Sequence, residues 1–503
     1  MSTFPQPFKS TVSHWQATNR GVTSLFNHGR DGALPKDTVD YVIIGGGISG
    51  CSLAYHLTRP GVADAKSVVL LEAKDVASGA SGRNGGHIAP LSFAAFPGLT
   101  APLPQGGAGL TEDEALEVIE MEKGNLEYIT ELVEQEKRDV DLWRGEKLEV
   151  KSSVGSAKTM KAAHDAWINA RSHSRFAHIP PHWQWIDDAE EAKRLSRAKG
   201  AIACSKGSAG SVHSHKLTTA FMRAALASGN CSLYSWAPVV SFEESEDGWT
   251  VDCGERGKIS TRQIIVCTNA HTRHLFKGEA IDKHLTPFQG QAALVTPPPS
   301  FSGSNYLAHT YTLEKGPYLM FTPSAGIVLG LPYVVAFAEG IGEKRDVWEV
   351  TDDSYVKPEL KKWLYEYCGK AFDDWGDEAP GEGGTRVWSG IQCASRDTLP
   401  LVGAVPGRKG LWVNVGHHGH GMGRIPFITR SLARTITTGQ WDGRLPSCFE
   451  ITEERLVKGQ TAPPFITDEE MRGETVPTAG RTGDGAKTVN KGGWWSGVRS
   501  FVR

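Results

Sequence analysis

Short apolar runs alternate along this chain with longer segments in which hydrophobic residues recur every three or four positions. The nearly continuous apolar runs at 41–44, 68–71 and 263–267 have the length and composition of buried parallel strands. Helical spacing over 111–138 predicts a long helix between them. Strands that alternate with helices in this way are typical of an α/β fold.

The helices carry start and stop signals of their own. Thr111 and Glu114 suit a capping box at the beginning of the long helix. A second helix is predicted over 215–228, where Gly229 follows its end, and a third over 426–438, after a glycine-rich loop.

Several strand-like segments fall outside the apolar runs. Candidate strands at 239–242 and 249–252 follow the second helix. Further segments at 291–295, 318–322 and 327–331 suggest a second sheet.

The two ends of the chain look different from its centre. Residues 1–39 lack periodicity, and we interpret them as an arm that lies over the globule and is anchored by an aromatic residue, with Trp15 and Phe26 as candidates. From Pro446 onward proline, glycine and charge dominate, and 475–493 has the composition of a disordered segment.

A glycine-rich turn joins the first apolar run to a predicted helix. Gly45 suits the tight turn, Gly47 suits close approach of a pyrophosphate, and Gly50 allows close packing of the helix on the strand. Glu72 ends the next strand, about twenty residues further on, where its carboxylate can bind a ribose diol. The acid disfavours NADP and leaves FAD or NAD. The flanking residues Ile48, Ser49 and Ala73 belong to the same predicted dinucleotide site.

Composition narrows the class of protein. A chain of 503 residues suggests two domains. No apolar run approaches the roughly twenty residues needed to cross a bilayer, and the N-terminus lacks a secretory core, so we expect a cytoplasmic protein that does not bind membranes. The net charge is −3 with dispersed basic residues, which argues against nucleic acid as a partner. The eight cysteines form no C-x-x-C pair, so reduced thiols are expected.

Further motifs extend the glycine turn. They are Ala77-Ser-Gly-Ala-Ser-Gly-Arg-Asn-Gly-Gly-His87, the segment 212–217, the segment 388–403, and Gly416-His-His-Gly-His-Gly-Met422. In this order they resemble the D-amino-acid oxidase family of FAD enzymes, which includes glycine and sarcosine oxidases and γ-glutamylputrescine oxidase. The resemblance covers most of residues 36–440 and implies FAD as the cofactor.

The resemblance also implies an architecture. It is an α/β fold in which a Rossmann-type FAD-binding domain is interleaved with an α+β substrate domain that contains an antiparallel sheet. The expected segments are an arm at 1–39, an FAD-binding domain at 40–110, 195–285 and 381–440, a substrate domain at 111–194 and 286–380, and a C-terminal extension at 441–503.

The loop at 77–87 offers backbone N–H groups, hydroxyls and one guanidinium. These groups suit a pyrophosphate and the edge of a flavin. The loop before the third helix directs N–H groups and a helix dipole at its ligand, which the family places at the flavin pyrimidine edge. The remaining cofactor-binding residues implied are Ser81, Gly82, Arg83, Asn84, Gly85, Gly86, His87, Val239, Thr268, Asn269, Ala270, Gly390, Gly416, Gly419, His420, Gly421 and Met422.

Two histidine hypotheses accompany these loops. His87 is a candidate flavin neighbour or covalent attachment point, and an ordinary buried histidine is the alternative. His417, His418 and His420 invite a metal, but adjacent loop histidines rarely converge on one ion and no carboxylate or cysteine accompanies them, so we expect no metal.

Departures from the family pattern constrain the substrate. Gln392 stands where several relatives hold an amino-acid carboxylate with arginine, and Gly423 stands where sarcosine oxidases use a lysine. Arg424 is a candidate replacement. Val328 stands at the position of a lysine that those enzymes use in oxygen reduction. A small α-amino acid is therefore a weaker candidate than an amine without an adjacent carboxylate.

We therefore predict an enzyme that oxidises the C–N bond of a small-molecule amine or amino-acid derivative to an imine, with FAD as cofactor and oxygen as acceptor. The substrate-side candidates are Gln392, His420, Met422, His87 and Tyr318. The alternatives are an FAD-dependent dehydrogenase with another acceptor, a tailoring oxidase of secondary metabolism, a flavin-binding protein without catalysis, and an NAD-linked dehydrogenase.

Overall fold

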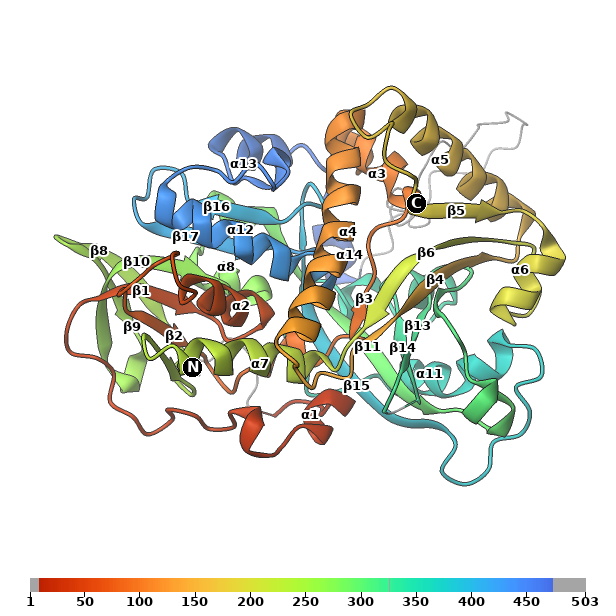
Figure 1. The fold of residues 1–503 in the computed structure, drawn as a ribbon, viewed down its shortest axis with the longest axis horizontal. Helices are drawn as coiled ribbons and strands as arrows, with labels where there is room; N and C mark the ends of the chain where they lie inside the picture. The colour runs from red at the N-terminus through yellow and green to blue at the C-terminus, as the bar shows by residue number, and fades with distance from the viewer. Residues whose placement is uncertain (1–8, 325, 474–503) are drawn as a thin grey trace.

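The computed structural model describes residues 9–324 and 326–473, and two large sheets organise them (Figure 1). In Figure 1 one sheet lies on the left and the other on the right, and the long helix α4 (Glu112–Gln135) stands between them. Over the described ranges, no helix combines the length and apolar character that crossing a membrane would require.

The first sheet is the Rossmann-type half of the molecule. Strand β1 (Val39–Ile44) pairs in parallel with β2 (Val68–Leu71) on one side and β10 (Lys258–Val266) on the other. These strands are rich in valine, isoleucine and leucine because helices and loops cover both faces of a parallel sheet. The other strands of this sheet are β7 (Cys231–Tyr234), β8 (Ser241–Ser245), β9 (Gly248–Asp252), β16 (Leu401–Ala404) and β17 (Leu411–Val415).

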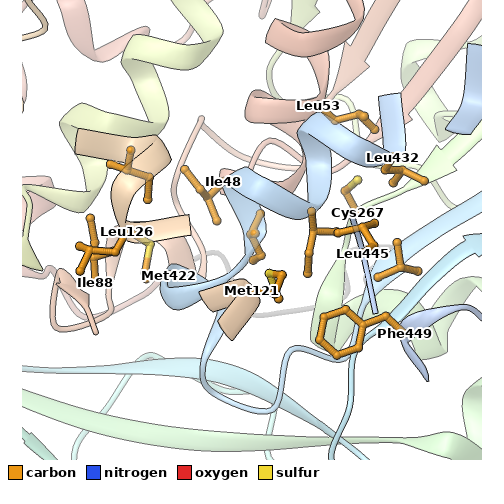
Figure 2. Close-up of a cluster of buried hydrophobic side chains, with 14 of the residues drawn as sticks. Ile48, Leu53, Ile88, Met121, Leu126, Cys267, Met422, Leu432, Leu445 and Phe449 are labelled. Atoms are coloured by element: carbon orange, nitrogen blue, oxygen red, sulfur yellow. The ribbon is translucent and has the colours of Figure 1, made fainter. Parts of the chain in front are cut away.

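Three helices form a layer against the first sheet. Helix α2 (Ile48–Leu57) packs between α7 (Ser214–Ala227) and α12 (Ile425–Thr438), and α4 contacts α12. Figure 2 shows part of the shared core, in which Ile48 and Leu432 belong to the same buried cluster. This core fixes where the glycine turn before α2 points.

The second sheet is mainly antiparallel. Its strand order is β15, β11, β14, β13, β12, β4, β6, β3, with β5 paired to β6, and only β12 and β4 run parallel. Its strands are β3 (His87–Ile88), β4 (Trp143–Lys151), β5 (Trp183–Ile186), β6 (Ala203–Ser211), β11 (Leu285–Thr296), β12 (Thr310–Thr312), β13 (Tyr318–Thr322), β14 (Gly326–Leu331) and β15 (Gly383–Ser395).

The other helices pack on the two sheets and on one another. They are α1 (His14–Thr18), α3 (Phe96–Thr100), α5 (Val154–Ser172), α6 (Ala189–Ser196), α8 (Thr272–Leu275), α9 (Ala280–His284), α10 (Tyr333–Ala338), α11 (Pro358–Ala371), α13 (Glu453–Gly459) and α14 (Asp468–Arg472).

The α/β fold class predicted from the sequence is confirmed, and so are the three helices. The capping box of Thr111 and Glu114 is present in full. The strand predicted over 239–242 is wrong in its first half, because β8 begins only at Ser241. Strands β4 and β6 were not predicted at all.

The N-terminal arm is anchored by one of its two candidates. Trp15 is 1% exposed and lies in the core, whereas Phe26 is 52% exposed, so Phe26 is not an anchor. The C-terminal segment through residue 473 also packs on the globule, since Phe465 stacks on Trp348 with ring centroids 4.5 Å apart. The segment predicted to be disordered, 475–493, lies outside the described residues.

The predicted domain boundaries remain a prediction. Strands β6 and β15 lie in the second sheet, although their residues fall in segments expected for the FAD-binding domain. The interleaving of the two halves is therefore finer than the sequence segments suggested.

Candidate active site

A cavity of about 1320 Å³ runs from the glycine turn of the first sheet to one face of the second sheet. Pockets for one small molecule usually enclose roughly 300–1,000 Å³, so this space suits a dinucleotide together with a second ligand. Every residue that the sequence analysis placed in the site lines it except four glycines, Gly50, Gly82, Gly86 and Gly416.

Those four glycines lie behind the cavity wall, where the backbone is crowded. A Cβ on Gly50 would collide with the carbonyl oxygen of Gly45, and one on Gly416 would lie 2.9 Å from Leu285. Gly86 has φ +78°, and a Cβ there would lie 2.9 Å from the Trp15 ring. These glycines allow close packing rather than ligand contact.

The turn before α2 has the geometry that its sequence predicts. Gly45 has φ +109°, and a Cβ there would lie 2.8 Å from the carbonyl oxygen of Cys267, the residue after the neighbouring strand β10. The Ser81 hydroxyl accepts a 2.7 Å hydrogen bond from the N–H of Ile48 at the start of α2. The helix N-terminus, the Ser81 loop and Gly47 thus enclose one end of the cavity, where a phosphate can meet free N–H groups.

Glu72 lines the same end and is held rigidly. Its carboxylate accepts hydrogen bonds from the N–H groups of Gly46, at 2.7 Å, and Lys74, at 2.8 Å. Burial raises the pKa of Glu72, and these two hydrogen bonds oppose the shift. The carboxylate therefore has a fixed position from which to accept ribose hydroxyls.

Arg83 joins several segments through its guanidinium. It donates to the Ser78 carbonyl at 2.8 Å and the Ser389 carbonyl at 3.0 Å, contacts the Thr11 hydroxyl at 3.1 Å, and lies 3.4 Å from an Asp353 oxygen. The guanidinium predicted to meet a cofactor thus ties the arm and β15 to the loop. Burial lowers the pKa of Arg83, and Asp353 opposes the shift.

Two buried indole rings hold the loop that contains Arg83 and Asn84 in place. Trp15 donates to the carbonyl of Asn84 at 2.6 Å, and Trp388 donates to the carbonyl of Arg83 at 2.7 Å. Both rings belong to a small buried cluster with Val328 and other apolar residues. The loop is therefore positioned by residues far away in sequence.

Side chains from the second sheet form the opposite wall. The amide of Gln392 packs against Gly290 and Gly419, and a Cβ on Gly419 would lie 2.5 Å from its Oε1. The Tyr318 ring lies across Gly330 and close to Gly85. Burial raises the pKa of Tyr318 to about 12, so this phenol stays protonated at neutral pH.

His87, in strand β3 of the second sheet, is held by a side chain of another strand in that sheet. Its Nε2 lies 2.9 Å from the hydroxyl of Thr310 in β12. Burial holds the pKa of His87 well below its ordinary value, and Lys147 and His420 add to the shift. The ring is therefore neutral at physiological pH.

His420 is oriented by an acid that the sequence analysis missed. Its Nε2 lies 2.8 Å from Oε2 of Glu122 in α4, and the Leu91 N–H donates to the same oxygen at 2.7 Å. The other oxygen of Glu122 lies 2.8 Å from the Arg424 guanidinium. Burial would raise the pKa of Glu122, but His420 and Arg424 outweigh it, and the pKa is lowered. Arg424 is used in this network and does not line the cavity, so it does not replace the missing carboxylate anchor.

Met422 faces the core as well as the cavity. It belongs to the same buried cluster as Ile88 and Leu126, which Figure 2 shows beside it. Asn125 of α4 donates to its carbonyl at 3.2 Å and accepts from the N–H of Phe427 at 3.0 Å. Helix α4 thus fixes the loop before α12 through two polar side chains, Asn125 and Glu122.

A row of charged residues on β4 was also missed. Lys147, Glu149 and Lys151 line the cavity and are each less than 9% exposed. Their alternation with Leu148 and Val150 is a strand signal that the sequence analysis could have used. Throughout the described part of the chain, no three histidine, cysteine or acidic side chains are grouped so as to hold a metal ion.

Crowded glycines, a helix N-terminus and the buried carboxylate of Glu72 form a dinucleotide site, the cradle, that is continuous with further space in the same cavity, as in dinucleotide-dependent oxidoreductases. The chain belongs to the FAD-dependent oxidoreductase (DAO) family, whose model matches residues 40–435. The residues in the cradle fit FAD, which is the cofactor of this family.

Curated relatives are distant. The chain is 22% identical over 228 residues to glycine oxidase of Pseudomonas putida, which covers 45% of this chain and 55% of that protein. It is 21% identical over 387 residues to glycine oxidase of Geobacillus kaustophilus, covering 76% and 89%. The chain thus spans about half the length of the Pseudomonas relatives that it matches.

Solved structures share the fold. The L-amino acid deaminase from Proteus vulgaris has a TM-score of 0.64 at 21% identity, over 86% of this chain and 98% of that one. The glycine oxidase from Geobacillus kaustophilus has a TM-score of 0.63 at 18% identity, over 83% and 99%.

Proposed function

We propose that the protein oxidises the C–N bond of an amine or amino-acid derivative to an imine and passes the electrons to oxygen, giving hydrogen peroxide. One observation carries this proposal. The dinucleotide site and the space against the second sheet are parts of one cavity. We call the region where they meet the junction, and place His87, His420, Tyr318 and Gln392 around it. Bound FAD supplies the hydride acceptor.

The residues at the junction hold the substrate and keep it neutral. A neutral His87 and a protonated Tyr318 place no charge beside the amine, whose lone pair must be free for hydride loss. Glu122 fixes the orientation of the His420 ring. Positioning and exclusion of water are then the contributions of the protein, and no protein base is required.

The two positions at which relatives bind a carboxylate next to the reacting carbon carry no arginine or lysine in this chain. Gln392 and Gly423 stand at the positions where relatives carry arginine or lysine, and Arg424 is paired with Glu122. The loss of a bidentate guanidinium contact costs about 1.5–3 kcal/mol for a carboxylate ligand. We infer that the preferred substrate carries no carboxylate on the reacting carbon.

The test begins with the purified protein. Its visible spectrum is recorded before and after acid precipitation, and amines are then screened anaerobically for bleaching of the flavin. We expect FAD in the acid supernatant; flavin retained in the precipitate would indicate covalent attachment, for which His87 is the candidate. Bleaching by an amine supports the proposal, and a flavin that no amine reduces argues for a binding protein without catalysis.

A dehydrogenase with another electron acceptor is the second candidate. Val328, at the position of the oxygen-activating lysine, lies in an apolar cluster with Trp15 and Trp388. Comparing hydrogen peroxide yield with dye reduction under turnover distinguishes the two, since an oxidase forms one peroxide per amine consumed in air.

A further inference from the structure

The charged face of β4 forms a second polar region within the cavity. Because side chains alternate along a strand, Lys147, Glu149 and Lys151 share one face. Leu148 and Val150 face the opposite way, into a buried core cluster. Ionisable residues on an inner face are unusual, because burying a charge is costly unless it has a partner.

Two of the three charges neutralise each other. The Lys147 ammonium lies 2.7 Å from Oε1 of Glu149, and the Ser92 hydroxyl donates to Oε2 at 2.7 Å. Burial would raise the pKa of Glu149, but Lys147 and these hydrogen bonds outweigh it, and the pKa is lowered. Glu149 is therefore an anion whose charge Lys147 already balances.

Lys151 has no direct ion-pair partner. It is 5% exposed, and among the described residues it forms no ion pair with a carboxylate. Glu314, the other nearby acid, accepts hydrogen bonds from the N–H of Ser152 at 2.9 Å and from the Ser156 hydroxyl at 2.6 Å, so its carboxylate is held away from the Lys151 ammonium. Burial lowers the pKa of Lys151, and Glu149 and Glu314 oppose the shift.

The position of Lys151 sets a length for the ligand. Lys147 is paired in register with Thr310, whose hydroxyl contacts His87 at the junction. Lys151 lies four residues further along the strand, a distance of about 13 Å at 3.3 Å per residue. The cavity continues there between Ser156 and Lys315, so the space reaches well beyond a small amino acid.

We propose that Lys151 binds a carboxylate at the far end of an elongated amine substrate, remote from the nitrogen that is oxidised. An ammonium without a direct partner can pair with one carboxylate, whereas a phosphate dianion would add a second negative charge to a region that already holds Glu149 and Glu314. The proposal rests on amine oxidation at the junction, and it accounts for the absence of a cation beside Gln392.

The experiment uses the FAD-loaded protein and straight-chain ω-amino carboxylates of increasing length, each compared with its primary amide. Binding is measured by anaerobic calorimetry with the matching non-oxidisable straight-chain carboxylates, and turnover by kcat/KM. For the best length we expect the carboxylate to bind about tenfold or more tightly than the amide. Lys151→Met should abolish this ratio with little change for the amide, and Lys151→Arg should retain part of it.

Lys158→Met is the matched control, since Lys158 is an exposed lysine on the adjacent α5. It should leave the carboxylate ratio unchanged. The proposal is overturned if carboxylates bind no better than amides at every length, or if Lys151→Met preserves the ratio. If no amine bleaches the flavin, amine oxidation fails, and the calorimetric ratio alone then decides whether Lys151 is an anion site.

Discussion

Single residues position the loops of the active site more than they contact its ligands. Glu122 is fully buried in α4 and contacts His420, Arg424 and the Leu91 N–H at once. In the sequence it follows Ile119 by three positions and precedes Leu126 by four, on the apolar stripe of the helix. An acid on that stripe is a signal of a buried ion pair, but its partners come from a loop 298 residues away and could not be predicted.

The Glu122 network predicts a loss of stability. Glu122→Gln should lower the free energy of unfolding by about 3–5 kcal/mol at neutral pH, because it leaves the Arg424 charge buried without its partner. Chemical denaturation measures this difference. Glu131→Gln, an exposed change on the same helix, should have little effect.

The same network predicts a pH dependence. The pKa of Glu122 is lower in the folded than in the unfolded protein, so its stabilisation is present above its ordinary pKa of 4.5 and is lost as the pH falls through the folded value. The stability difference between wild type and Glu122→Gln should therefore shrink below about pH 4.5. An unchanged difference at acid pH would contradict this assignment.

Gly419 gives a prediction about catalysis. It has φ +74°, and a Cβ there would lie 2.5 Å from Oε1 of Gln392, so Gly419→Ala should displace the loop or the amide. Misplacement of a positioning group by about 1 Å can lower the rate about a hundredfold, so we expect kcat/KM to fall by about that factor. Gly443→Ala, where a Cβ meets nothing within 4 Å, is the control. Equal kcat/KM for the two variants would argue against a role for this contact.

At the scale of elements, long parallel strands and capped helices were predictable because their signals are local. Strand β4 was predictable as a strand from the alternation in Lys147–Lys151, but the burial of its charged face was not, since the same alternation is typical of a strand with one face in water. Only the tertiary structure shows that the loop after β3 and helix α5 lie opposite that face. An N-terminal arm with an aromatic anchor was predicted from the sequence. Which aromatic residue is the anchor, Trp15 or Phe26, depends on packing against distant residues.

The contact between the N-terminal arm and the loop at Asn84 leads us to expect weaker FAD binding when Trp15 is truncated. Trp15→Ala removes the indole that donates to the Asn84 carbonyl and should weaken FAD binding, because the loop loses this fixed position. The same change should lower the free energy of unfolding by about 3–5 kcal/mol. Fluorescence titration of the apoprotein with FAD measures this effect. Phe26→Ala, at a half-exposed ring in the same arm, should bind FAD normally. Tight binding by Trp15→Ala would show that the loop holds its shape without the arm.

At the scale of the whole molecule, the cavity joins two sheets that the chain crosses several times. The cradle comes from β1, β2 and β10, whereas the opposite wall comes from β11, β13 and β15. Arg83 links the loop of one half to β15 of the other through the Ser389 carbonyl. A ligand in this cavity therefore contacts both halves, and its binding energy is shared between them.

Removal of FAD should consequently destabilise both sheets together. A ligand present at a hundred times its Kd adds about 2.7 kcal/mol to the free energy of unfolding, so the apoprotein should unfold at a lower temperature. Hydrogen exchange distinguishes how that energy is distributed: on FAD addition, amides of β1 in the cradle and of β11 in the opposite wall should both gain protection. Protection confined to β1 would mean that the second sheet folds independently of the cofactor, and that the contacts of Gln392 and Tyr318 with the loops add little to the cohesion of the molecule.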